Sequence, residues 1–207
     1  MVNWINQTAR RVPEWVFYAF GAVPFFWLTY RLFTGGLGVD PTKAVEHALG
    51  RYGLQFLIAT LCVTPLRRFS GVNLLKFRRA LGLLAFVYIC LHLLAWLLLD
   101  IQLLWGQIWA DILKRPYITI GMVGFILMIP LALTSNAFSV RKLGAKWRSL
   151  HKLTYVVAIL GVAHFVMLSK GWQLEPSMYL WGVIALLVLR NPVRISPSQR
   201  LLRQGAE

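Results

Sequence analysis

Long apolar windows recur along this chain, and they constrain its fold more than any other feature. Each window covers roughly 17 to 25 residues, the length that a helix needs to cross a hydrocarbon core of about 30 Å. Of the 207 residues, 58% are hydrophobic and 14% are charged, whereas a soluble domain is about a quarter charged. The sequence therefore predicts an all-α integral membrane protein, folded as a single domain over residues 1–207.

Six membrane spans can be placed on the apolar windows. The joins between them are marked by glycine and proline, at "GGLGVDP" (35–41), at Pro116 and at Pro176. We expect a bundle of six transmembrane helices at approximately 15–33, 47–66, 80–99, 117–133, 151–169 and 177–189.

The positive charges predict how the bundle is oriented. The net charge is +15, but the charges cluster in short connections between apolar windows, a pattern of membrane topology and not of nucleic-acid binding. Of the 22 Lys and Arg residues, sixteen fall in the N-terminal segment, the second and fourth connections and the C-terminal segment. The other six are Arg31, Lys43, Arg51, Lys114, Arg115 and Lys170. Because the richer side faces the cytoplasm, both termini are predicted to be cytoplasmic.

Three of the four histidines lie at two matched depths. His151 and His164 are thirteen residues apart on the fifth span, or about 20 Å along a helix. His92 on the third span, which runs in the same direction, has a depth similar to that of His164. Imidazoles inside a membrane tend to mark function, and imidazole is a usual axial ligand of haem iron. His92 and His164 are therefore predicted to hold one haem iron between them, the alternative being hydrogen bonds between helices.

Two further groups of polar residues attract attention. Arg78 stands fourteen residues before His92, at the depth of His151, where another histidine would complete a second pair. Near the outer end of the second span, Glu46 and His47 could bind a quinol headgroup, contact a partner or shuttle a proton, or could form an interfacial hydrogen-bond cluster. Arg51 is expected to pair with Glu46 or Asp40, the alternative being a haem propionate.

Five blocks of the sequence carry a resemblance to a known family. They are residues 35–66, "RRALGLLAFVYICLHLLAW" (78–96), "RPYITIGMVGF" (115–125), "LALTS" (131–135) and residues 141–166. With these blocks the chain resembles the ferric-reductase-like transmembrane family, which places two histidines on its third span and two on its fifth. Carried over, the pattern implies a complete haem site at His92 and His164. It also implies a second haem at His151, whose other ligand would have to be Arg78, another side chain or a partner.

The resemblance also implies a function. It implies a bacterial inner-membrane subunit that carries electrons through one or two b haems and that also binds FMN. Electrons would come from quinol or a cytoplasmic flavin reductase, and would pass to a periplasmic molybdopterin protein that reduces methionine sulfoxide in oxidised proteins. The chain has no G-x-G-x-x-G motif and only seventeen residues after Arg190, so a separate electron donor is expected. Two alternatives remain: a self-contained transmembrane reductase of ferric iron or another acceptor, and a histidine-based transporter of metal ions or protons.

Overall fold

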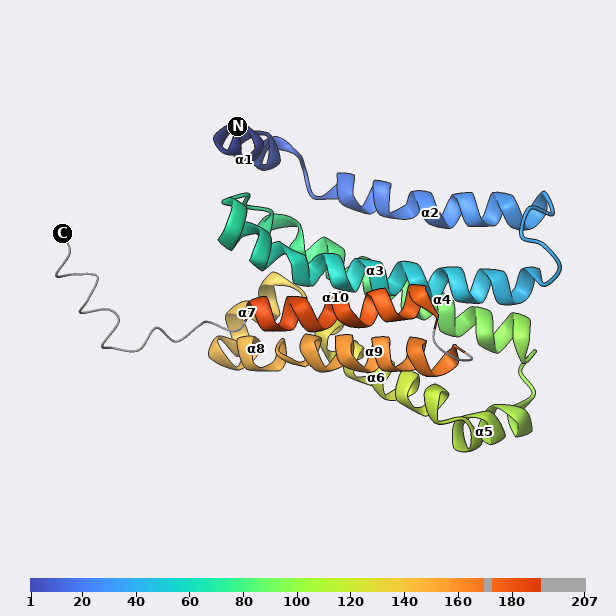
Figure 1. Ribbon diagram of the computed structural model, residues 1–207. Helices are drawn as coiled ribbons and strands as arrows, with labels where there is room; N and C mark the ends of the chain where they lie inside the picture. Colours follow the sequence, from blue (N-terminus) through green and yellow to red (C-terminus); the bar gives the residue numbers. More distant parts are fainter. Residues whose placement is uncertain (170–172, 191–207) are drawn as a thin grey trace, which may run out of the picture.

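The computed structural model describes residues 1–169 and 173–190, and within them every regular element is a helix (Figure 1). The first half contains α1 (Val2–Arg11), α2 (Trp15–Phe33), α3 (Pro41–Ser70), the 3₁₀ turn η1 (Leu75–Phe77) and α4 (Arg78–Ala95). A π-helical turn, η2 (Trp96–Asp100), ends α4. The second half contains α5 (Trp105–Lys114), α6 (Pro116–Leu133), α7 (Ala137–Leu143), α8 (Ala145–Leu150), α9 (Leu153–Leu168) and α10 (Leu174–Arg190).

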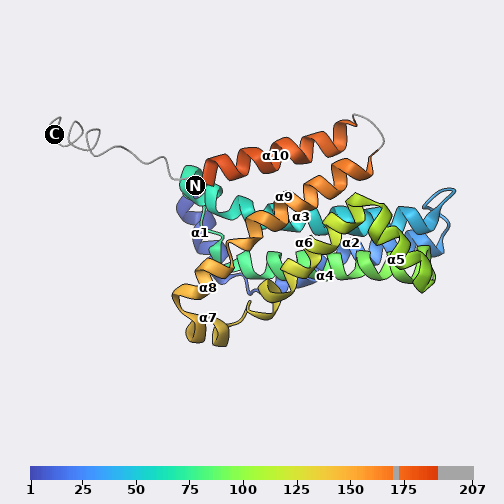
Figure 2. The same cartoon turned by 90° about the horizontal axis from the view of Figure 1, so that it is seen from below.

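The long helices α2, α3, α4, α6, α9 and α10 run along one bundle axis, and the chain reverses direction from each to the next (Figures 1 and 2). Among the described residues, five segments are long and apolar enough to cross a membrane: Trp15–Phe33, Pro41–Ser70, Leu75–Asp100, Pro116–Leu133 and Ala145–Leu168. They contain the first five predicted spans, apart from the last residue of the fifth. Helix α10 has only 17 residues, so the predicted count of six spans stays a prediction.

The helices begin and end where local chemistry dictates, which moves some of the predicted bounds. Helix α3 begins at Pro41 instead of residue 47, because the Asp40 side chain accepts a hydrogen bond from the Lys43 N–H (3.0 Å) and Pro41 occupies the first helical position. It ends at Ser70 and is capped by Gly71, whose φ of 73° is readily adopted only by glycine. The second span is therefore longer than its apolar window.

Four short helices, α1, α5, α7 and α8, lie at the two ends of the bundle (Figures 1 and 2). None of them was predicted, because each is too short to produce an apolar window. Helix α5 is amphipathic: it buries Ile108 in the protein and exposes Trp105, Trp109 and Leu113 at four-residue spacing. Tryptophan is common where a membrane meets water, so α5 has the composition of an interfacial helix.

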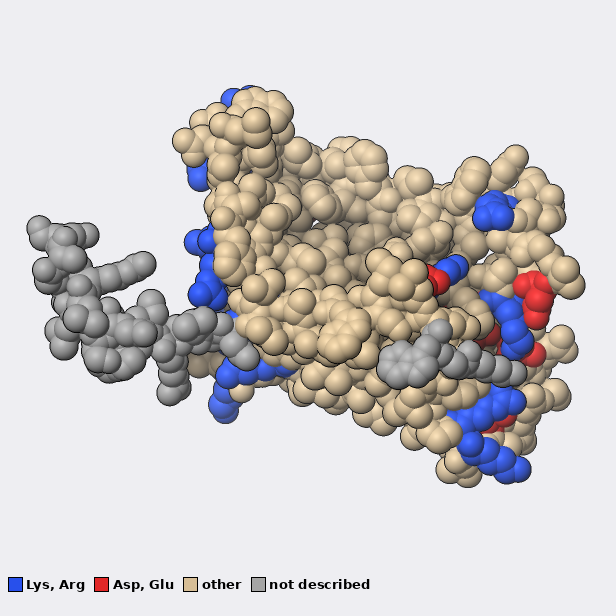
Figure 3. Space-filling model, viewed as in Figure 1, with Lys and Arg blue, Asp and Glu red and all other residues tan. Residues whose placement is uncertain are grey.

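Charge separates the two ends of the bundle from its apolar middle (Figure 3). In this view Lys and Arg gather at the end that carries α1, α7 and α8, whereas the opposite end shows both signs of charge. Among the charges counted for orientation, Lys170, Arg194, Arg200 and Arg203 lie outside the described residues.

Helices α3, α4, α6 and α9 form the centre of the fold. The side chains of Leu61, Ala85 and Ala158 are fully buried, and those of Val157 and Val162 nearly so. Since Ala85 and Ala158 are small, they let α4 and α9 approach the bundle axis closely. Helix α10 packs against α9 and α3, and the Arg190 guanidinium at its end donates hydrogen bonds to the Leu61 carbonyl and the Thr64 hydroxyl.

Helix α2 is joined to α4 by a buried tyrosine. The Tyr88 hydroxyl donates a hydrogen bond to the Gly21 carbonyl (2.6 Å) and accepts one from the Phe25 N–H (3.1 Å). In a regular helix these two backbone groups would bond to each other, so the hydroxyl of Tyr88 lies within the hydrogen-bond ladder of α2. This contact fixes the position of an otherwise largely exposed helix.

Candidate functional site

His92, on the last full turns of α4, is held by the backbone of α3. Its Nδ1 lies 2.8 Å from the carbonyl oxygen of Glu46. Since a carbonyl can only accept a hydrogen bond, Nδ1 carries the proton and donates it. The other ring nitrogen, Nε2, therefore keeps its lone pair and is free to bind a metal ion.

His164, on α9, is held in the same way by the backbone of α6. Its Nδ1 lies 2.7 Å from the carbonyl oxygen of Tyr117, so this nitrogen also donates and Nε2 again keeps its lone pair. A hydrogen bond of this kind fixes the tautomer and orientation of a metal-binding imidazole.

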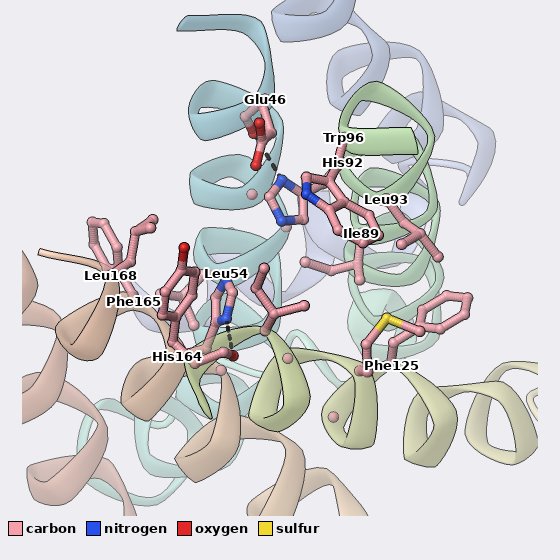
Figure 4. A pocket seen from close by; sticks show the side chains of 18 of the residues that line it. Glu46, Leu54, Ile89, His92, Leu93, Trp96, Phe125, His164, Phe165 and Leu168 are labelled. Carbon is pink, nitrogen blue, oxygen red and sulfur yellow. Dashed lines mark hydrogen bonds between the residues drawn. The ribbon is translucent and has the colours of Figure 1, made fainter. Parts of the chain in front are cut away.

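The two imidazoles face each other across one pocket. Their ring centroids are 6.2 Å apart and their planes are inclined by 76°. Figure 4 shows the nitrogen not bonded to a carbonyl turned, in each ring, toward the other histidine. Two imidazoles on one metal ion, with bonds of about 2 Å each, have centroids separated by about 6 Å, so the spacing suits a shared iron atom.

The pocket is walled by apolar side chains and has charged ones at one end. Its walls come from α3, α4, α6 and α9 and include Leu54, Ile89, Phe125, Met128, Val157 and Phe165 (Figure 4). At one end the lining includes Lys43, Arg51 and Arg115. Each of these cations has a carboxylate partner: Lys43 pairs with Asp100 (3.1 Å), Arg51 with Glu175 (3.2 Å) and Arg115 with Asp111 (3.2 Å).

The expected partner of Arg51 was wrong. Arg51 pairs with Glu175 in the first turn of α10, and not with Glu46 or Asp40. The reason lies in the tertiary arrangement, because α10 packs beside α3 and brings its acidic first turn to Arg51. Proximity in the sequence could not reveal this contact.

Glu46 is the polar residue of the pocket whose hydrogen bonding is incomplete. Its carboxylate oxygen Oε2 is buried and has no hydrogen-bond partner among the described residues, although buried polar groups are almost always paired. The adjacent His47 is exposed. An unpaired carboxylate oxygen in the pocket fits a site that receives a molecule with a hydrogen-bond donor.

His151 has a different environment from the other two histidines. It lies between α8 and α9, its ring stacks on Trp147 with centroids 4.0 Å apart, and its Nε2 lies 3.0 Å from the Thr134 hydroxyl. That hydroxyl donates its one proton to the Pro130 carbonyl (2.6 Å), so we assign the proton of the second bond to His151 Nε2. The lone pair of His151 then sits on Nδ1.

Arg78 is the first residue of α4 and is half-buried. Within residues 1–169 and 173–190, no hydrogen bond joins it to His151. The structure thus brings together His92 and His164 from the predicted site residues, and places His151 and Arg78 elsewhere.

The donor set favours a metal ion that brings its own equatorial ligands. In the described part of the chain, no group of three or more His, Cys, Asp or Glu side chains is placed to hold a bare ion. Two imidazoles that face each other across an apolar pocket are a donor set that suits a haem iron.

Comparison with known proteins identifies the family. Residues 49–162 match the ferric reductase like transmembrane component. The chain belongs to the ferric-reductase-like transmembrane family. It is also 51% identical over 176 residues to the protein-methionine-sulfoxide reductase heme-binding subunit MsrQ of Agrobacterium fabrum (strain C58 / ATCC 33970), which covers 85% of this chain and 82% of that protein.

Other relatives of this ferric-reductase-like chain carry the same name. The MsrQ subunit of Brucella anthropi is 51% identical over 180 residues, covering 87% of this chain and 81% of the relative. That of Brucella ovis is 50% identical over 176 residues, covering 85% and 80%. No solved structure matches the chain. The predicted resemblance to the family is thereby confirmed, and the chain is a multi-pass membrane protein.

The sequence did not reveal the two backbone carbonyls that accept hydrogen bonds from His92 and His164. Glu46 and Tyr117 act through their backbone oxygens, and any residue can supply a backbone oxygen. No residue type could have marked these acceptors.

Proposed function

We propose that the chain holds one b haem between His92 and His164 and serves as the transmembrane electron-transfer subunit of a methionine-sulfoxide reductase system. The observation that carries the proposal is the facing pair of imidazoles, each with Nδ1 bound to a carbonyl and Nε2 free. Support comes from the relatives, which are named as heme-binding subunits of that reductase.

The pocket residues fit this cofactor in three ways. His92 and His164 stand at the spacing of two axial ligands. The apolar walls suit a macrocycle, and the cations at the charged end, Lys43, Arg51 and Arg115, would attract its carboxylates.

A bound b haem supplies a one-electron carrier whose iron alternates between the ferric and ferrous states. The chain sets how that carrier behaves. His92 and His164 would hold the haem from its two faces, and a haem held by two histidines would favour electron transfer over substrate chemistry. The Nδ1 hydrogen bonds make both imidazoles more basic, and the apolar walls keep water away from the site.

The position of the pocket suggests where electrons leave. Its charged end, with Lys43, Arg51 and Arg115, lies at the end of the bundle poorer in positive charge. With the positive-rich end in the cytoplasm, α10 crosses as a sixth span and this pocket lies near the periplasm of a bacterial inner membrane. There it can deliver electrons to a periplasmic molybdopterin subunit that reduces methionine sulfoxide.

The electron donor belongs to the same proposal. Quinol can reach a site in the outer half of the bundle directly. A cytoplasmic flavin reductase would need a further carrier, FMN or a second haem, because His151 and His164 are separated by about 20 Å of helix. The single haem at His92 and His164 therefore favours quinol as the donor.

The experiment tests transfer of electrons to the partner. The purified protein, loaded with haem and reduced by a quinol analogue, is mixed with a periplasmic methionine-sulfoxide reductase and then with methionine sulfoxide. With the partner in catalytic amount, we expect the reduced haem band to persist until methionine sulfoxide is added, and to persist with methionine sulfoxide alone. The proposal would be contradicted if ferric citrate reoxidised the haem rapidly without the partner while the partner and methionine sulfoxide did not reoxidise it. That result would favour a self-contained ferric reductase.

A further inference from the structure

Both candidate haem ligands contact a glycine on the neighbouring helix. The Nδ1 of His92 lies beside Gly50 of α3, and the Nδ1 of His164 lies beside Gly121 of α6. A Cβ atom on Gly50 would stand 3.1 Å from His92 Nδ1, and one on Gly121 would stand 2.8 Å from His164 Nδ1. The first distance is tighter than nine in ten real Cβ contacts, and the second is too short without a shift of the ring.

Each glycine stands four residues after the carbonyl that its histidine uses. Glu46 precedes Gly50 and Tyr117 precedes Gly121 by one helical turn, so the carbonyl of each pair points along the helix toward its glycine. An imidazole can reach such a carbonyl from the side only if its ring lies against the next turn. A side chain at the glycine position would occupy that place.

The same arrangement is built twice, from different helices. The pair α3 and α4 provides Glu46, Gly50 and His92, and the pair α6 and α9 provides Tyr117, Gly121 and His164. Because glycine inside a helix is less favourable than alanine, its presence at both contact points calls for a specific reason. Close packing of helices is one such reason in membranes, but at these two glycines the nearest atoms belong to the histidine rings.

We propose that Gly50 and Gly121 are positioning residues of the haem site, which fix the tautomer, the tilt and the basicity of His92 and His164. The inference rests on the proposed haem at these histidines. The missing side chain of each glycine leaves a notch in the helix surface. The notches at Gly50 and Gly121 let each ring reach a backbone carbonyl, and this holds the imidazole planes at an angle of 76°. A methyl group at either glycine pushes the ring away from its carbonyl, weakens the hydrogen bond that Nδ1–H donates to that carbonyl, and makes the ligand less basic.

The test compares Gly50→Ala and Gly121→Ala with the unaltered protein. Both variants should fold, since alanine favours a helix. We expect a higher midpoint potential of the haem, because a less basic imidazole stabilises ferric iron less, and haem binding about 10- to 100-fold weaker, as for other lost partners of metal-binding histidines. Gly121→Ala should change more than Gly50→Ala, since its added carbon stands closer to the ring.

A spectroscopic readout separates positioning from general packing. Low-spin ferric haem with near-perpendicular axial imidazole planes gives a strongly anisotropic EPR signal, and a change in ring tilt moves it. Gly82→Ala is the matched control, because Gly82 lies inside α4 and its added carbon would be 4.0 Å from the nearest atom, in Thr60. The control should keep the potential, the EPR signal and the haem content.

The outcomes are distinct. If both notch variants kept the potential, EPR signal and haem affinity of the unaltered protein, the positioning role would be overturned. If Gly121→Ala did not fold, the milder Gly50→Ala would carry the test alone. If the unaltered protein bound no haem, the proposed function itself would fail, which is a different result from unchanged variants.

Discussion

The imidazoles of this protein differ in which nitrogen is left free. His92 and His164 donate from Nδ1 to backbone carbonyls, whereas His151 is assigned to donate from Nε2 to the Thr134 hydroxyl. Only the first two therefore present Nε2 to a common pocket. The facing Nε2 atoms of His92 and His164 suit a shared iron atom, and their orientation depends on acceptors from other helices.

His151 should not be needed for the haem at His92 and His164. His151→Ala should keep the haem content and the haem spectrum, because its ring is stacked on Trp147 and bonded to Thr134, away from the His92–His164 pocket. The measurement is haem per polypeptide in purified protein. A fall to half of the unaltered ratio would show that His151 holds a second haem.

The sequence could predict the depth of these residues but not their surroundings. Counting along apolar windows places His92 and His164 at one level, and the structure brings their rings together. The side of the helix on which each histidine lies did not support a common site, since thirteen residues leave about 140° of rotation between His151 and His164. The notches at Gly50 and Gly121 could not be predicted, because they require knowing which helices pack together.

At the scale of elements, single contacts decide how helices dock. The Tyr88 hydroxyl lies between the Gly21 carbonyl and the Phe25 N–H of α2, and Gly21 lets Leu84 of α4 approach closely. Apolar windows predicted the long helices well, because length and composition suffice for them. The short helices at the bundle ends have no such signal.

Tyr88→Phe should loosen α2 and lower the stability of the protein by about 1–3 kcal/mol, the usual cost of leaving buried hydrogen-bonding groups without a partner. Thermal unfolding in detergent, followed by circular dichroism, measures the effect. Tyr52→Phe is the matched control: its ring packs against Tyr88, and its hydroxyl makes no hydrogen bond among the described residues. Equal stability of the two variants would show that the Tyr88 hydroxyl contributes nothing.

At the scale of the whole molecule, the open question is the number of crossings. The N-terminus and the end of α10 lie at the same end of the bundle (Figure 1), which carries much of the positive charge (Figure 3). With 17 residues, α10 is about 25 Å long, near the lower limit for a span. Six crossings with the positive end in the cytoplasm is the arrangement we expect.

Fusions to alkaline phosphatase, which is active only outside the cytoplasm, test this topology. A fusion after Gly36 should be active, and fusions after Asn73 and after Arg190 should be inactive, because positive connections stay inside. Fusions of a fluorescent protein that matures only in the cytoplasm should give the converse pattern. An active phosphatase after Arg190 would mean that α10 does not cross the membrane.

A haem shared by His92 and His164 should be lost when either histidine is replaced, and this can be measured. Dithionite-reduced minus oxidised spectra, with a haem assay per polypeptide, are recorded for the detergent-purified protein and for His92→Ala and His164→Ala. We predict a b-type α-band with one haem per chain in the unaltered protein, and loss of that haem in each variant. No haem band in protein made with ample haem, or a full low-spin spectrum in either variant, would contradict the claim.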